Sequence, residues 1–145
     1  MIPTNTLFEA LLSVLPTTYP LKFSYIERST VSGTNVTVTK NTGALYFRSA
    51  GNGQYREVST GKYRVNSYRL ILNLYTDKGE SGVLAGLSYC AEVCEVLDTL
   101  FNKSITVGDD TVFIVSCNKL GNYQYLGPTD QGIASFSLNY LIKFS

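Results

Sequence analysis

The chain has 145 residues, of which 44% are hydrophobic and 16% are charged, a composition too apolar for a disordered chain and too interrupted by polar residues for a membrane span. The length fits one domain with one hydrophobic core, spanning residues 1–145. The formal net charge is +1 and histidine is absent, which removes the usual general base of serine and cysteine hydrolases and the commonest metal ligand. We therefore expect a protein that is not an enzyme and that holds neither a metal nor a cofactor.

The start of the chain and its cysteines predict a protein that folds and stays in a reducing cytosol. Residues 1–16 have no basic start, carry Glu9 and lack a long apolar run, so a signal peptide is not expected. Cys90, Cys94 and Cys117 are odd in number and cannot all pair within one chain. Cys90 and Cys94 lie four residues apart on a predicted helix, where we expect small buried apolar side chains rather than a redox or metal site.

The first element expected in chain order is a short helix that begins at Thr6. Glu9 follows three residues later, and the two residues have the pattern of a capping box with Thr6 as the N-cap. Pro16 ends this helix, because proline cannot continue it. The predicted apolar face comprises Leu7, Phe8, Leu11, Leu12 and Leu15.

Strands are expected in the segment that follows the first helix. Residues 21–27 alternate in polarity, and a second strand is expected at residues 36–38, directly after turn-forming residues. A turn at residues 41–43 leads into a short strand over 44–48. Residues 51–62 are expected to form a polar, glycine-bearing excursion.

A helix is predicted over residues 81–101, after a strand that ends at Asp77, Lys78 and Gly79. Ser81 is able to cap this helix at its N-terminus. Apolar side chains recur at steps of three and four residues, so they are expected to face the sheet. They are Val83, Leu87, Ala91, Cys94, Leu97 and Phe101.

The remaining strands alternate clearly in polarity. Residues 68–75 place Tyr68 and three leucines on one face and a half-apolar set on the other, which can be covered as well. Residues 105–117 are expected to form a hairpin with a solvated turn, and residues 135–144 a closing strand. The order of elements predicts an α+β fold: a mostly antiparallel sheet with one long helix packed on a face and a short N-terminal helix.

The charges are unevenly distributed along the chain. Residues 22–78 contain nine Lys or Arg and three Asp or Glu, giving +6, whereas residues 80–110 contain one Lys and six acidic residues, giving −5. In one interpretation the two regions face each other within the monomer or are simply solvated. In the other, a basic surface of one copy meets an acidic surface of the next, the arrangement that a head-to-tail ring needs.

An aromatic residue stands beside an arginine four times in the basic region, at Phe47-Arg48, Tyr55-Arg56, Tyr63-Arg64 and Tyr68-Arg69. Such pairs can stack bases and hold phosphates, so one hypothesis is a small nucleic-acid-binding module that uses the Tyr/Arg-rich segment 46–69. Adjacent residues of a strand point to opposite faces, however, and Tyr and Arg are also the residues enriched as anchors of protein interfaces. We therefore favour contact with protein.

The C-terminal half resembles a known family. The order of strand, long helix and short hairpin, followed by YLGPTDQGIASFSLNYLIKF, resembles the tail-terminator proteins of long-tailed bacteriophages, often labelled minor capsid proteins. The matching motifs are Leu126-Gly127, the turn at residues 130–132 and the pair Asn139-Tyr140. The resemblance covers residues 68–145 and the first helix, and residues 28–66 do not take part in it.

This resemblance implies a structural virion protein that closes into a ring, expected to hold six copies. Such a ring docks on the last ring of the tail tube, ends tail polymerisation and joins the tail to the head. The implied partners are further copies of the chain, the tail tube protein and a head-completion protein, with DNA passing through the lumen without sequence-specific contact and no membrane. The implied location is the head-tail junction of the virion, after assembly in the host cytoplasm.

We expect the segment from residue 43 to residue 64 to reach a neighbouring subunit or the tail tube. The candidate interface residues are the basic and aromatic residues of this segment and two acidic residues of the predicted second helix. They are Arg48, Tyr55, Arg56, Tyr63, Arg64, Glu92 and Glu95.

Overall fold

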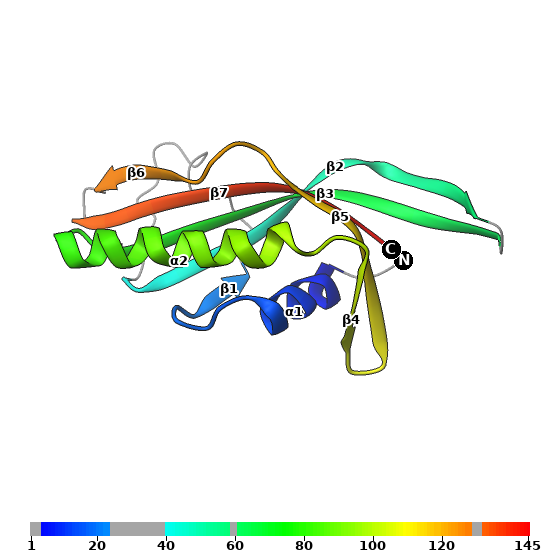
Figure 1. Ribbon diagram of the computed structural model, residues 1–145, viewed down its shortest axis with the longest axis horizontal. Coiled ribbons are helices and arrows are strands. Elements are labelled where there is room, and N and C mark those ends of the chain that lie inside the picture. The colour runs from blue at the N-terminus through cyan, green and yellow to red at the C-terminus, as the bar shows by residue number, and fades with distance from the viewer. Residues whose placement is uncertain (1–3, 24–39, 59–60, 129–131) are drawn as a thin grey trace.

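A computed structural model describes residues 4–23, 40–58, 61–128 and 132–145 of the chain, with side chains described outside residues 4 and 49–64. In this part of the chain the fold is α+β, with two helices and a mostly antiparallel, curled sheet (Figure 1). The predicted class is therefore correct. The strands expected at residues 24–27 and 36–38 lie outside the described residues.

The elements follow one another as predicted over most of the described chain, with one strand, β6, that was not expected. They are α1 (Thr4–Val14), β1 (Leu21–Phe23), β2 (Thr42–Val58), β3 (Gly61–Asp77), α2 (Glu80–Asp98), β4 (Lys103–Val107), β5 (Asp110–Lys119), β6 (Gln124–Pro128) and β7 (Ile133–Phe144).

The sheet has the strand order β1-β2-β3-β7-β5-β4, and every pairing is antiparallel except that of β1 with β2. Strand β7 lies at its centre, between β3 on one edge and two strands on the other. There, β5 pairs with residues 140–144 and β6 with residues 134–137. The ladder extends to the last residue, because Ser145 and Phe113 exchange two backbone hydrogen bonds of 3.0 Å.

The N-terminal helix begins earlier than the sequence predicts. Thr6 is the third residue of α1 and is buried, so it is not the N-cap, and the expected capping box with Glu9 is wrong. The predicted apolar face is largely correct, since Leu7, Leu11 and Leu15 belong to the main core. Helix α1 lies against β4 and β5 and covers that end of the curled sheet.

Helix α2 packs against β3, β7 and β5, but with a different face from the one predicted. Cys94 and Leu97 are buried as expected, whereas Ala91 is exposed and Phe101 is 69% exposed beyond the end of the helix. Val83 and Leu87 are only half-buried. The buried positions are Gly86, Tyr89, Cys90, Val93, Cys94 and Leu97.

A glycine explains this rotation of the helix. A Cβ atom at Gly86 would clash with the ring of Phe136, so only glycine lets the α2 backbone approach that ring. Tyr89 then turns toward α1, where its hydroxyl donates a 3.0 Å hydrogen bond to the Pro16 carbonyl oxygen. The expected cap is also wrong: Ser81 lies inside the helix, and the N-cap is Gly79, without a side-chain capping bond.

The face of the sheet turned away from α2 is also covered in part. Ala44, Tyr46, Ile71, Asn73 and Tyr75 are all buried on it. The expectation that strand 68–75 can be covered on its second face is therefore confirmed. A sheet buried on both faces accounts for the apolar residues that occur at consecutive positions of β3.

The segment expected to be a polar excursion forms instead a projecting pair of strands, which we call the arm (residues 49–58 of β2 and 61–65 of β3). The two strands pair as far as Val58 and Gly61, whereas β7 pairs with β3 only from Asn66 onward. Beyond Asn66 the pair leaves the body of the sheet and extends to one side (Figure 1). The register shifts twice at the root, between Ser49 and Gln54, and such bulges bend a strand.

Candidate subunit interface

The basic and aromatic residues predicted for the interface come together on the arm and at its root. In the register of β2 and β3, Tyr55 lies directly opposite Arg64, and Arg56 lies directly opposite Tyr63. Each tyrosine is thus beside an arginine of the other strand as well as beside one in its own strand. Arg48, exposed at the root, precedes the first register shift.

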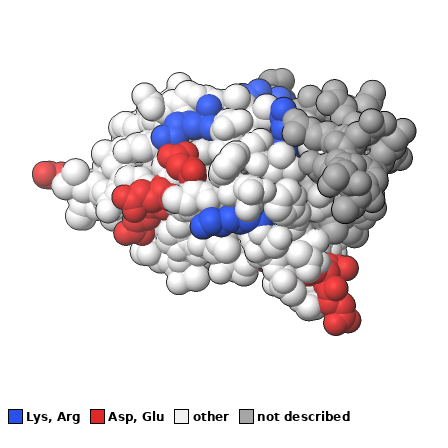
Figure 2. Space-filling view, turned by 45° about the vertical axis from the view of Figure 1, so that its right-hand side comes forward, with Lys and Arg blue, Asp and Glu red and all other residues white. Residues whose placement is uncertain are grey.

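The two predicted acidic residues lie on the solvent side of α2. Glu92 and Glu95 are exposed, and residues 80–98 contain four acidic residues and no Lys or Arg, giving −4. Neither glutamate forms an ion pair within the described part of the chain. Figure 2 shows acidic side chains gathered where α2 lies, and a second acidic group toward the tip of the β4–β5 hairpin.

The arm and the acidic side of α2 are separated in space. Figure 1 shows the arm extending away from the body, while α2 runs along the opposite half of the sheet. Among the side chains that the structure describes, which do not include residues 49–64, Lys40 pairs with Asp77 at 2.9 Å and Lys119 with Asp98 at 3.6 Å. The basic arm and acidic helix therefore do not face each other within one chain.

Asp98, the last acidic residue of α2, is engaged within the chain. It accepts a 3.0 Å hydrogen bond from the Tyr140 hydroxyl, and Lys119 lies 3.6 Å from its second oxygen. Burial raises the pKa of Tyr140 well above its ordinary value, with hydrogen bonds to Cys94 and Asp98 adding to the shift. This cluster ties the end of α2 to β7 and β5, and leaves Glu80, Glu92 and Glu95 as the helix carboxylates that face solvent without such contacts.

The three thiols are buried within the body, which confirms the prediction made for Cys90 and Cys94. Burial raises the pKa of Cys90 to about 12 and that of Cys117 to about 12, with nearby Cys94 and Asp98 adding smaller shifts. A thiol is a nucleophile or a metal ligand only as the thiolate, which these surroundings disfavour. Within the described residues no group of three or more Cys, Asp or Glu side chains is placed to hold a metal ion.

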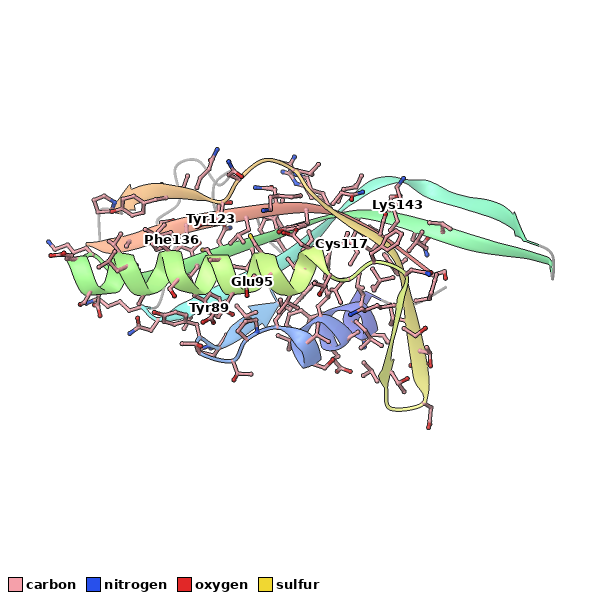
Figure 3. All side chains as sticks on the ribbon, viewed as in Figure 1. Tyr89, Glu95, Cys117, Tyr123, Phe136 and Lys143 are labelled. Atoms are coloured by element: carbon pink, nitrogen blue, oxygen red, sulfur yellow. The ribbon has the colours of Figure 1, made fainter. Side chains whose placement is uncertain are left out.

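Sequence reasoning missed several exposed apolar side chains. Leu84 on α2 is 58% exposed, and Tyr125 and Leu126 on β6 are 44% and 54% exposed. Tyr125 packs on Phe136, with ring centroids 5.2 Å apart. Phe136 is buried and lies against α2 at Gly86 (Figure 3). Leu126 falls at a register shift of β6. The Leu126-Gly127 motif is the sequence feature that could have indicated this irregular strand, since Gly127 has φ +86°.

No family model matches this chain, and no curated protein matches it significantly. No helix within the described ranges has both the length and the apolar character needed to cross a membrane.

Proposed function

We propose that the chain is a structural, non-enzymatic virion protein that forms a ring on the phage tail tube, ends tail polymerisation and joins tail to head. The arm carries the proposal: a projecting two-stranded ribbon whose tip is remote from its own core. Two-stranded ribbons are marginally stable alone, so a second surface that packs on the arm would account for its length. The resemblance of residues 68–145 to tail terminators supports a ring as the product.

The charges support a head-to-tail contact between copies. The arm contains Arg56, Lys62 and Arg64 against Glu57, giving +2, whereas α2 is acidic on its exposed side. Because the arm extends away from its own α2, attraction between the two is available only to different copies. Such a heterologous contact uses two different surfaces of each subunit, and it closes into a ring when the rotation between neighbours allows.

The remaining parts of the proposal follow from the resemblance. The ring holds six copies, contacts the tail tube protein on one side and a head-completion protein on the other, and lies at the head-tail junction. DNA passes through its lumen without sequence-specific contact. The exposed apolar residues Leu84, Tyr125 and Leu126 are available to add contact area to the charged contact between copies.

Charge reversal tests the arm. Arg56→Glu with Arg64→Glu should weaken self-association and tube capping, because like charges across the contact repel. Restoration by Glu92→Lys with Glu95→Lys in the neighbouring copy would assign the contact to these two surfaces. The measurements are the mass of the assembly by light scattering and the length of assembled tails, with circular dichroism to confirm folding.

A matched control makes the same change in charge away from the arm. Lys22→Glu with Lys103→Glu reverses two exposed cations, on β1 and β4. It should leave assembly intact if the arm is the contact. Equal loss in both variants would show that net charge alone governs association, and normal assembly in the arm variant would contradict an electrostatic contact through the arm.

A further inference from the structure

Apolar side chains of α2 and β6 form a surface along one edge of the molecule. Buried Phe136 of β7 joins the two elements, because its ring packs on Tyr125 of β6 and lies against α2 at Gly86. In the view of Figure 3, Tyr123 and Phe136 lie between β6 and α2. We call this surface the edge strip. Its residues are Leu84, Leu87, Tyr123, Tyr125 and Leu126, of which Leu84 and Leu126 are more than half exposed.

The spacing along α2 places its two leucines of the edge strip on the side of the helix that faces β5 and β6. Asp98 marks this side, because it accepts a hydrogen bond from Tyr140 of β7 and lies 3.6 Å from Lys119 of β5. Leu84 and Leu87 precede Asp98 by about four and about three whole helical turns. Strand β6 continues the edge of β7 along which β5 pairs. The leucines of α2 and the residues of β6 therefore form one continuous surface.

The part of the edge strip that β6 forms is free of charge. Residues 120–128 contain no Lys, Arg, Asp or Glu. Edge strands of soluble proteins usually carry charged residues, which discourage contact with other chains. Among the described strands β6 pairs with β7 alone, and its register shift and Pro128 oppose the addition of a further strand. The edge strip is therefore suited to contact through side chains, as exposed apolar patches at protein interfaces are.

Carboxylates border the edge strip along α2. Glu80 lies one helical turn before Leu84, and Glu95 lies about three turns after it, so both are on the same side of the helix. Both glutamates are exposed, and neither forms an ion pair within the part of the chain that the structure describes. A partner that fits this surface combines apolar or aromatic side chains with positive charge.

The arm has this combination on one of its two faces. Residues directly opposite each other in a ribbon lie on the same face, as do residues two apart in one strand. Arg56 lies opposite Tyr63, and Val58 is two residues from Arg56, so these three residues share a face. Glu57, the one acidic residue of the arm, lies on the other face with Tyr55. The face with Arg56 thus has the residue types that the edge strip requires.

We propose that the edge strip binds the arm of a neighbouring copy, through the face of the arm that carries Arg56, Val58 and Tyr63. Tyr63 packs on Leu84 and Leu126, and the acidic border attracts Arg56. The arm extends away from the body of its own chain, so the occupant is a second copy (Figure 1). This inference rests on the proposed function, because it names the surface at which the arm joins two copies.

The first test removes the apolar contact and leaves all charges in place. Leu84→Ser with Leu126→Ser should raise the concentration needed for self-association about tenfold or more, because exposed apolar anchors carry much of the energy of an interface. Phe101→Ser is the matched control, since Phe101 is 69% exposed beyond the other end of α2 and should not affect assembly. Light scattering over a series of concentrations measures assembly. Thermal melting confirms folding, and Leu126→Ser alone serves if the double variant is unfolded.

The second test detects the contact itself by cross-linking. Chains with Leu126→Cys are mixed with size-tagged chains with Tyr63→Cys and oxidised mildly, and the mixed dimer is measured on a non-reducing gel. The three native thiols are buried and should not take part. Tyr55→Cys in place of Tyr63→Cys is the control for the opposite face of the arm, and it should give a severalfold smaller yield.

The outcomes separate this inference from the proposed function. If the original chain stays monomeric at every concentration, both fail. If the original chain assembles and the arm variant Arg56→Glu with Arg64→Glu does not, normal assembly of Leu84→Ser with Leu126→Ser overturns the edge strip alone. Equal weakening by Phe101→Ser also overturns it, as does a higher yield of cross-linking from Tyr55→Cys than from Tyr63→Cys.

Discussion

The body and the arm are built from the same two strands by different means. In the body, β3 is flanked by β2 and β7 and buried on both faces, so the positions of Leu72 and Tyr75 are fixed by packing. In the arm, the same strand has only β2 beside it. Stability is therefore concentrated in the body, whereas the sequence of the arm can vary with the surface that it contacts.

The largest expected effect is in the core beneath α2. Leu97→Ala should lower the free energy of unfolding by about 2–5 kcal/mol, because Leu97 is 1% exposed and its removal leaves a cavity. Leu87→Ala on the same helix is the matched control, and its loss should be smaller because Leu87 is half-buried. Chemical denaturation of both variants checks this, and equal losses would contradict the rotation of the helix described above.

Alkaline pH should also weaken the body. The pKa of Cys90 and that of Cys117 are each raised by burial to about 12, so both thiols stay protonated in the folded chain after they ionise in the unfolded chain. Their stabilising contribution is full below their unfolded pKa, about 8.5, and is lost as pH rises through about 12. Denaturation midpoints should be level near neutral pH and fall above about pH 9.

Replacing one thiol shows how much of the loss of stability at high pH that thiol causes. Cys90→Ala should make the fall in stability with pH less steep, while lowering stability slightly at neutral pH. Thiol titration gives an independent reading, because all three buried thiols should react with a disulfide reagent only after denaturation. A thiol that reacts rapidly in the folded chain at neutral pH would contradict its burial.

A smaller effect is expected at Gly86. A Cβ atom there meets the ring of Phe136, so Gly86→Ala should cost about 1–3 kcal/mol from overpacking, reduced by about 1 kcal/mol because alanine favours a helix. Ala85→Gly is the control, since Ala85 is exposed inside the same helix and its replacement measures helix propensity without a contact in the core. Thermal melting of the two variants separates steric conflict from helix propensity, and Phe136→Leu added to Gly86→Ala should recover part of the loss.

Sequence predicted most of the body because burial follows periodicity. The alternation in residues 135–144 gave the buried set of β7 correctly, and the hairpin of β4 and β5 followed from its turn. The rotation of α2 was not predictable from apolar spacing alone, since it depends on one glycine that meets a ring 50 residues later. Thr6 is a residue type that commonly caps a helix, but the helix begins before it.

The candidate site was predicted in part. Residue types indicated Tyr55, Arg56, Tyr63 and Arg64. The strands around them were not predicted, because the glycines and polar residues of this segment interrupt the alternation of apolar and polar residues. The opposition of Arg48 and Arg69 depends on cross-strand register. The sequence pattern could not predict this register, because the bulges between Ser49 and Gln54 shift the pairing of the two strands.

The smallest effect on stability is expected from shortening the arm. Replacing residues 56–63 by Asn-Gly joins Tyr55 to Arg64, which lie directly opposite each other, through a two-residue turn suited to a hairpin. Because this removes only a two-stranded ribbon beyond the last pairing of β3 with β7, the free energy of unfolding should change by about 0.5 kcal/mol or less. Assembly should nevertheless be lost if the arm is the contact between copies. Denaturation and light scattering on one preparation measure both quantities, and a loss comparable to that of Leu97→Ala would show that the arm takes part in holding the body together.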